Sequence, residues 1–183
     1  MLTVISPAKK LDYSGTQTAQ PFTQPALIEH AKELHKGLKN LSPQDVCALM
    51  GLSDKLGALN YERFQEWHTP FNAENAKQAV LAFKGDVYQG LDADSMTQAD
   101  LEWAQNNLCI LSGLYGVLRP LDLMQPYRLE MGTKFVNPRG KDLYHFWDGI
   151  INQHLNSLLT GSNPVLVNLA SNEYFKATRE KTL

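Results

Sequence analysis

The stretch of residues 111–132 holds the densest concentration of side chains that could do chemistry in this chain. Arg119 and Arg128 could each grip a phosphate through parallel hydrogen bonds. They could instead pair with Asp122 and Glu130 in a buried structural network. Charges placed so close to apolar residues need partners, which favours a binding or catalytic site. The same stretch also contains two tyrosines that could stack on a nucleobase, Tyr115 and Tyr127.

Three short apolar runs are predicted to be buried strands, because each is too short for a helix and ends at a turn signal. These runs cover residues 2–5, 108–111 and 165–170, and they are followed by Ser6, Ser112 and Ser171. If the strands are parallel neighbours, their serines gather at one sheet edge, where open α/β sheets place ligands. Because serine is also a common turn residue, an ordinary set of turns is the alternative.

A single pocket at that edge would collect polar residues from nearly the whole sequence. Strand ends lie at the surface, and the loops there can present a lysine and an arginine toward a shared anion. We therefore expect one pocket to be lined by Ser6, Lys9, Asp86, Ser112, Arg119, Tyr127, Arg128 and Ser171.

Asp86 stands in a short segment between two glycines, Gly85 and Gly90, which is predicted to be a loop. Loops carry function disproportionately often, although an aspartate there can also serve a turn. An enzyme acting on nucleic acid or nucleotides would use paired carboxylates beside serines and cations. The catalytic candidates are Asp86, Glu130, Ser6, Lys9, Ser112 and Tyr115.

Residues 42–66 are predicted to form two helices joined by a tight turn. Ser42 followed by Pro43 is a strong helix start. The spacing of Gly51, Ser53 and Gly57 resembles the helix-hairpin-helix of DNA-repair proteins, in which backbone N–H groups meet a phosphate. Ser53 stands where that motif has a second glycine, and an ordinary helical hairpin with Gly51 as its C-cap is the alternative. Two bases could add phosphate contacts, Lys55 and Arg63.

Amphipathic helices are predicted between the strands. The leucines and alanine of residues 27–38 recur on one helical face, and Thr97 begins a helix that runs to about residue 107. Asn72 is predicted to cap a helix that reaches Phe83, and Asp142 to cap one that ends at Gly161. Alternating helices and strands favour a single layered α/β or mixed α+β domain.

The charge balance limits the partners of the protein. Among its 183 residues, 17 bases and 19 acids give a net charge of -2, so binding a polyanion requires a local basic patch. Residues 115–145 carry an excess of bases, and residues 84–107 carry an excess of acids. No apolar run is long enough to span a membrane, and the N-terminus has no signal-peptide pattern, which favours the cytosol. No metal-ligand or cofactor motif is present, so we expect neither.

Four motifs together resemble the peroxide stress protein YaaA family. They are Ser6-Pro7-Ala8-Lys9, the run Phe83-Lys84-Gly85-Asp86-Val87-Tyr88, residues 111–132, and the run from Asn168 to Phe175. The similarity covers the whole chain, and its central stretch is highly specific. It implies a distinctive mixed α/β fold, with a mixed sheet flanked by helices and a helix-hairpin-helix element at 42–66.

The resemblance also implies a function. It indicates a cytoplasmic bacterial protein of the hydrogen peroxide response that limits iron and oxidant damage and binds the backbone of double-stranded or branched DNA. The expected contacts come from the hairpin and a basic cleft: Gly51, Ser53, Lys55, Arg63, Arg119, Tyr127, Arg128, Arg139 and Lys141. Direct iron sequestration is a weaker alternative, because the histidines and cysteines lack ligand spacing. Family members continue further, so residues 1–183 are expected to form one domain that lacks a basic C-terminal segment.

Overall fold

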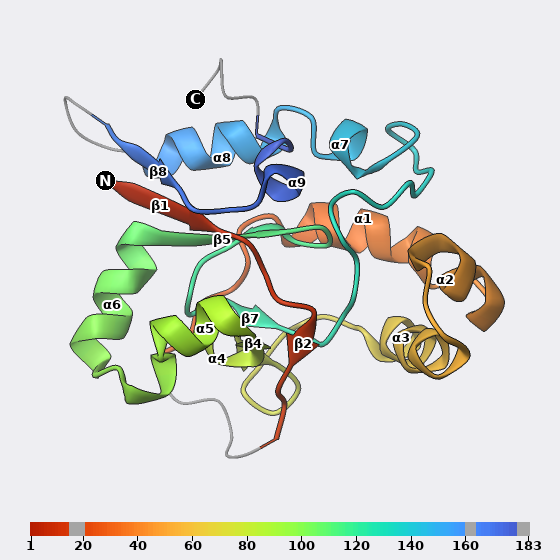
Figure 1. Ribbon diagram of the computed structural model, residues 1–183, viewed down its shortest axis with the longest axis horizontal. Coiled ribbons are helices and arrows are strands. Elements are labelled where there is room, and N and C mark those ends of the chain that lie inside the picture. Colours follow the sequence, from red (N-terminus) through yellow and green to blue (C-terminus); the bar gives the residue numbers. More distant parts are fainter. Residues whose placement is uncertain (15–20, 160–163, 179–183) are drawn as a thin grey trace.

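The computed structural model describes residues 1–14, 21–159 and 164–178, which form a mixed α/β arrangement (Figure 1). In this part of the chain, the main sheet has the order β6-β5-β1-β8. Its strands are β1 (Leu2–Ile5), β5 (Leu108–Ser112), β6 (Gly116–Leu118) and β8 (Leu166–Asn168). The predicted mixed fold and all three predicted strands are confirmed, with β8 shorter than expected.

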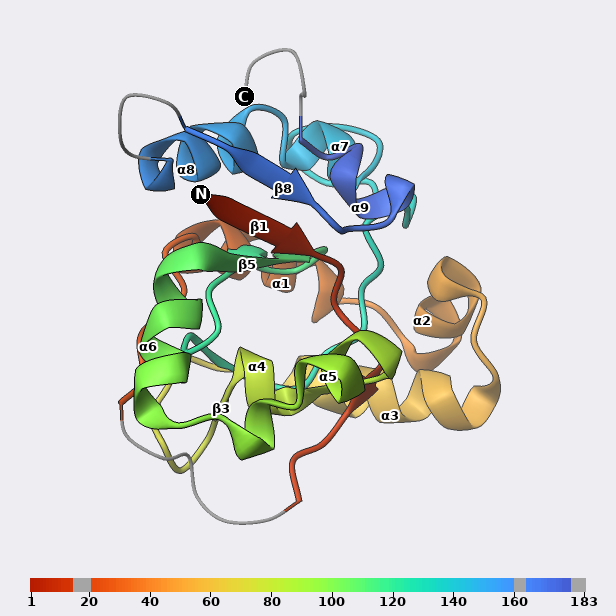
Figure 2. The same ribbon diagram turned by 60° about the vertical axis from the view of Figure 1, so that its left-hand side comes forward.

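Strand β1 lies between β5 and β8 and runs parallel to both, whereas β6 returns antiparallel to β5. The register pairs Val4 with Cys109 on one side and with Asn168 on the other. β5 is buried along its whole length, as expected for a strand covered on both faces. Figure 2 shows β1 and β8 pointing toward the side of the molecule that carries α9 (Asn172–Phe175).

Three longer helices surround the sheet: α1 (Ile28–Leu38), α6 (Gln98–Asn107) and α8 (Ile150–Leu158). The predicted apolar face of α1 is confirmed, because Ala31, Leu34 and Leu38 are fully buried. α6 contacts β1 and β5, and α8 contacts β6. The largest fully buried side chains form one core between these layers: Trp147, Tyr115, Phe64, Phe83 and Phe146.

The helix predicted from Asn72 to Phe83 is wrong. The Asn72 side chain accepts hydrogen bonds from the backbone N–H groups of Glu74 and Asn75, but this cap supports only a turn. The following residues pair with distant segments instead, which overrides their helix propensity. They form β3 (Lys77–Gln78), which pairs with β7 (Leu123–Met124), then α4 (Ala79–Ala82), and β4 (Phe83–Lys84), which pairs with β2 (Lys10–Leu11).

The long helix predicted after Asp142 is broken in two. Asp142 caps α7 (Leu143–Phe146) by accepting a hydrogen bond from the His145 backbone N–H at 2.9 Å. The chain then turns at Gly149, whose φ of 74° is a left-handed conformation that glycine adopts without strain, and α8 follows. Gly161, the predicted end, lies outside the described residues.

The predicted pair of helices at 42–66 is present as α2 (Pro43–Met50) and α3 (Asp54–Glu66). Ser42 and Asp45 form a reciprocal capping box at the start of α2, and Thr97 and Asp100 form another at α6. In both ribbon views, α2 and α3 lie on the opposite side of the molecule from α6 (Figures 1 and 2). The remaining short helices are α5 (Asp86–Leu91) and the 3-10 helix η1 (Ala93–Ser95).

Candidate functional site

The serines that follow the three parallel strands gather at one sheet edge, as predicted. The Ser6 hydroxyl oxygen accepts a hydrogen bond from the Ser171 backbone N–H at 2.9 Å. Ser112, at the end of the neighbouring strand β5, is fully buried, and its Oγ lies 2.6 Å from the Tyr127 hydroxyl oxygen. Parallel pairing therefore brings three segments that are distant in sequence to the same edge.

A small cavity opens beside these strand ends, and we call it the strand-end pocket. Its volume is about 70 Å³. The lining comes from the segment after β1, the stretch around Arg128 and the start of α9. The residues are Pro7, Ala8, Lys9, Tyr127, Arg128, Leu129, Glu130, Glu173 and Tyr174. Of the eight residues predicted to share one pocket, Lys9, Tyr127 and Arg128 line it. The other five are not part of its lining: Ser6, Asp86, Ser112, Arg119 and Ser171.

Charged side chains of both signs line the strand-end pocket. One oxygen of Glu130, Oε1, is 3.0 Å from Lys9 Nζ and 3.3 Å from an Arg128 Nη atom. The Arg128 side chain is only 20% exposed, whereas that of Lys9 is 66% exposed. Among the described residues, the buried Nε of Arg128 has no hydrogen-bond acceptor. Glu173 Oε1 accepts a hydrogen bond from the Gly132 backbone N–H at 2.8 Å.

Tyr174 adds a buried phenol to the pocket. Burial raises the pKa of this hydroxyl, and the charges of Glu173 and Glu130 raise it further, whereas a hydrogen bond with the Met131 backbone lowers it. The phenol therefore stays protonated at neutral pH. Glu173 and Tyr174 were missed among the predicted site residues, although they lie two and three positions after the third strand-end serine, a position that the same topological argument covers.

Of the six catalytic candidates, only Lys9 and Glu130 line the strand-end pocket. Ser6 and Ser112 stand at the strand ends outside its lining, and the other two candidates lie elsewhere. Asp86 is the exposed first residue of helix α5, whereas a loop was predicted there. Tyr115 is fully buried, and its hydroxyl oxygen accepts a hydrogen bond from Trp67 Nε1 at 2.8 Å. Tyr115 is thus part of the core.

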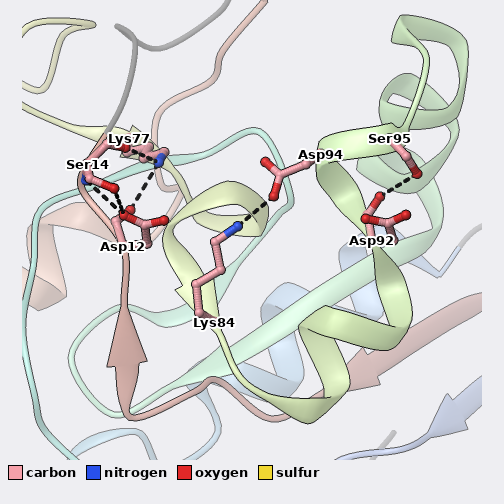
Figure 3. Close-up of polar contacts among 7 residues, drawn as sticks. All are labelled: Asp12, Ser14, Lys77, Lys84, Asp92, Asp94 and Ser95. Atoms are coloured by element: carbon pink, nitrogen blue, oxygen red, sulfur yellow. Dashed lines mark hydrogen bonds and ion pairs between the residues drawn. The ribbon is translucent and has the colours of Figure 1, made fainter.

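The acidic segment after β4 forms an ion pair with a nearby lysine. Lys84 Nζ lies 2.7 Å from an Asp94 carboxylate oxygen (Figure 3). In the same view, Lys77 Nζ donates to the backbone oxygens of Asp12 at 3.1 Å and Ser14 at 3.3 Å. Both lysine side chains therefore bind partners within the protein.

The turn between α2 and α3 has a compact geometry. Gly51 adopts the left-handed conformation with φ 61° and closes α2, because its N–H donates to the Cys47 oxygen. Ser53 is the N-cap of α3, and its side chain makes no capping hydrogen bond. A Cβ added to Gly57 would lie 2.0 Å from Cys47 Sγ, so the glycine permits the close contact of the two helices. Lys55, in the first turn of α3, is exposed.

Arg63 of α3 and Arg128 of the strand-end pocket are close enough for their charges to interact. Burial lowers the pKa of Arg63, and the positive charge of Arg128 lowers it further. A hydrogen bond from Arg63 to Asn60 Oδ1 at 3.3 Å orients the guanidinium. Arg63 also lines a second cavity with Tyr13 and Gln125, next to the segment that carries Arg128.

The other predicted phosphate-binding residues are not brought to this side. Arg119 follows the antiparallel strand β6, and its Nε donates to the Gln105 backbone oxygen at 2.8 Å, so the structure separates it from the strand-end serines. Arg139 pairs with Glu33 and stacks 4.3 Å from the centre of the Phe146 ring. Lys141 is exposed.

Within residues 1–14, 21–159 and 164–178, no group of at least three His, Cys, Asp or Glu side chains could hold a metal ion. The helices described there are too short or too polar to cross a membrane.

Comparisons with known proteins agree with the resemblance noted in the sequence. The family model described as peroxide stress protein YaaA matches residues 1–183. A protein from Saccharophagus degradans is 61% identical over 185 residues, which cover all of this chain and 72% of that protein. A protein from Burkholderia multivorans is 55% identical over 186 residues, again covering the whole chain and 72% of the relative. Both relatives carry the name UPF0246 protein.

Proposed function

Because the chain belongs to the peroxide stress protein YaaA family, we propose that it acts in the bacterial hydrogen peroxide response by binding the DNA backbone. In this proposal, the protein works in the cytoplasm and limits the damage that iron and peroxide cause to DNA. The α2–α3 turn provides the main contact, and the surface that extends from it to Arg128 provides further contacts.

The geometry of the α2–α3 turn carries the proposal. The first amides of a helix lack intrahelical acceptors and favour anions, and phosphate groups bind at such ends. The Ser53 side chain does not cap α3, and Lys55 stands exposed in the first turn of that helix. Gly57 holds α2 and α3 in direct contact, so the turn is presented on a rigid base.

Two arginines support the proposal: Arg63 within the hairpin that α2 and α3 form, and Arg128 near it. Arg63 and Arg128 repel each other, and an anion placed between them would relieve that repulsion. A phosphate backbone offers such anions at regular spacing. With a net charge of -2, the protein has no general attraction to DNA, so these local contacts must supply the affinity.

Fluorescence anisotropy with labelled DNA tests this function. The wild-type chain is titrated against a short duplex, a four-way junction and a single strand at one low salt concentration. We expect saturable binding to the duplex or the junction, and several-fold weaker binding by Lys55→Gln and Arg63→Gln with every sequence, because phosphate contacts carry no sequence information.

Lys84→Gln is the matched control, because it removes the same charge from a lysine that is already paired with Asp94. Its affinity should equal that of the wild type. Equal losses of affinity in all three variants would indicate a general charge effect and contradict a contact through the α2–α3 turn. An absence of binding to every DNA would contradict the proposed function itself.

A further inference from the structure

The strand-end pocket has unused hydrogen-bonding capacity of both kinds. Arg128 and Lys9 contact a single carboxylate oxygen between them, which leaves most of their N–H groups without acceptors in the described part of the chain. The second oxygens of Glu130 and Glu173 likewise have no partner among the described residues. The pocket therefore offers donors and acceptors side by side.

The size of the pocket excludes large ligand groups. A buried water molecule needs a cavity volume of ~10–15 Å³, and a cavity that holds benzene measures ~150 Å³. At about 70 Å³, the strand-end pocket has room for a small polar head group and is too small for a nucleobase. The geometry consequently does not favour an enzyme that acts on a base at this position.

The charges of the pocket select the kind of head group. Two cations, Lys9 and Arg128, face two anions, Glu130 and Glu173, so the formal charges cancel. A phosphate dianion would be repelled by both carboxylates, and a simple amine would be repelled by both cations. A group that carries one positive and one negative charge matches both pairs.

We propose that the strand-end pocket binds a zwitterionic α-amino carboxylate head group. The Arg128 guanidinium, whose fork matches a planar carboxylate, binds the carboxylate end, with Lys9 beside it. The free oxygens of Glu130 and Glu173 accept from the ammonium end. Tyr174 lines the same pocket and adds an uncharged polar side chain to it. The exposed Lys9–Glu130 pair is weak, so a ligand can replace it.

This site shares Arg128 with the proposed DNA-binding surface, but it requires neither Lys55 nor Arg63. Isothermal titration calorimetry of the whole chain tests it with four probes: glycine, acetate, methylammonium and inorganic phosphate. We expect glycine to bind about tenfold more tightly than acetate or methylammonium, because only glycine makes charge-assisted hydrogen bonds at both ends.

Variants assign the binding to this pocket. Arg128→Lys keeps the charge but loses the planar fork, and Glu130→Gln removes a negative charge, so each should weaken glycine binding about tenfold. Lys9→Gln changes an exposed side chain, so it should leave the fold intact and weaken glycine binding several-fold. This variant keeps the test decisive if the Arg128 variant unfolds. Lys55→Gln should bind glycine like the wild type even though it weakens DNA binding.

Three results would overturn the proposal. The first is an absence of saturable glycine binding by the wild type, and the second is glycine binding no tighter than that of acetate. The third is tighter binding of phosphate than of glycine, which would make the pocket an oxyanion site instead. If DNA binding fails while glycine binding follows this pattern, the pocket assignment stands without the proposed function.

Discussion

Ser6 and Ser171 are separated by 165 positions in the sequence and are joined by two hydrogen bonds at the strand-end edge of the sheet. The Ser6 hydroxyl accepts from the Ser171 backbone N–H at 2.9 Å and donates to the Ser171 hydroxyl oxygen at 3.3 Å. This link ties the turn after β1 to the start of α9, and both of these segments line the strand-end pocket.

Ser6→Ala should lower the free energy of unfolding by about 1 kcal/mol, because it removes both hydrogen bonds. Urea unfolding followed by circular dichroism measures this change. Ser157→Ala is the control, because the Ser157 hydroxyl bonds only locally, to the His154 oxygen. A loss in Ser6→Ala no larger than that in the control would show that the link contributes nothing to stability.

Gly57→Ala should destabilise the protein by ~1–3 kcal/mol, because its Cβ would lie 2.0 Å from Cys47 Sγ and force the helices apart. The double variant Cys47→Ala with Gly57→Ala should recover most of this loss, since it removes the clashing sulfur. Thermal unfolding of the wild type, the two single variants and the double variant measures the coupling.

Gly90→Ala in α5 is the matched control for that change. The added Cβ meets nothing within 4 Å, so the variant should gain about 0.5–1 kcal/mol of stability from reduced backbone freedom. If the Cys47→Ala change fails to rescue Gly57→Ala, the contact of α2 with α3 does not explain the cost.

Asp122 should make stability depend on pH between about 4 and 6. Burial raises the pKa of this carboxyl from 3.8 to about 6, although hydrogen bonds from the Arg119 N–H and the Thr23 hydroxyl partly oppose the shift. The folded state therefore binds the proton more tightly than the unfolded state does. The stability that the protonated Asp122 carboxyl contributes is complete below pH 3.8 and is lost as the pH rises to about 6. The free energy of unfolding changes by about 3 kcal/mol over this range.

Urea unfolding across this pH range, compared between wild type and Asp122→Asn, isolates the effect, and the variant should lose the dependence. Asp100→Asn provides a control of opposite sign, because hydrogen bonds from Thr97 lower the pKa of Asp100. The stability that Asp100 contributes is present above its ordinary pKa and is lost as the pH falls. An unchanged pH dependence in Asp122→Asn would contradict the assignment.

Local sequence signals predicted much of the fold. The capping boxes at Ser42 and Thr97 involve residues only three apart, and the buried face of α1 follows from helical periodicity. The helix predicted from Asn72 failed because Lys77 and Gln78 pair with β7, more than forty positions away. Such pairing leaves no local signal.

The candidate site was predicted only in part, because long-range strand pairing decides which residues meet there. The strand-end serines could be grouped because parallel strands end at one edge. Arg119 could not be separated from Arg128 in this way, because the return of β6 antiparallel to β5 takes Arg119 away from that edge. A buried partner such as the Gln105 oxygen is visible only in three dimensions.

The salt dependence of duplex binding tests the proposed function most directly. If the hairpin surface neutralises phosphates, the logarithm of the association constant falls linearly with the logarithm of salt concentration, with a slope of about -0.9 for each contact. The double variant Lys55→Gln with Arg63→Gln should flatten this slope by about 1.8, whereas Lys84→Gln should leave it unchanged. Binding that ignores salt, or a slope that the double variant does not alter, would contradict a backbone contact through the hairpin.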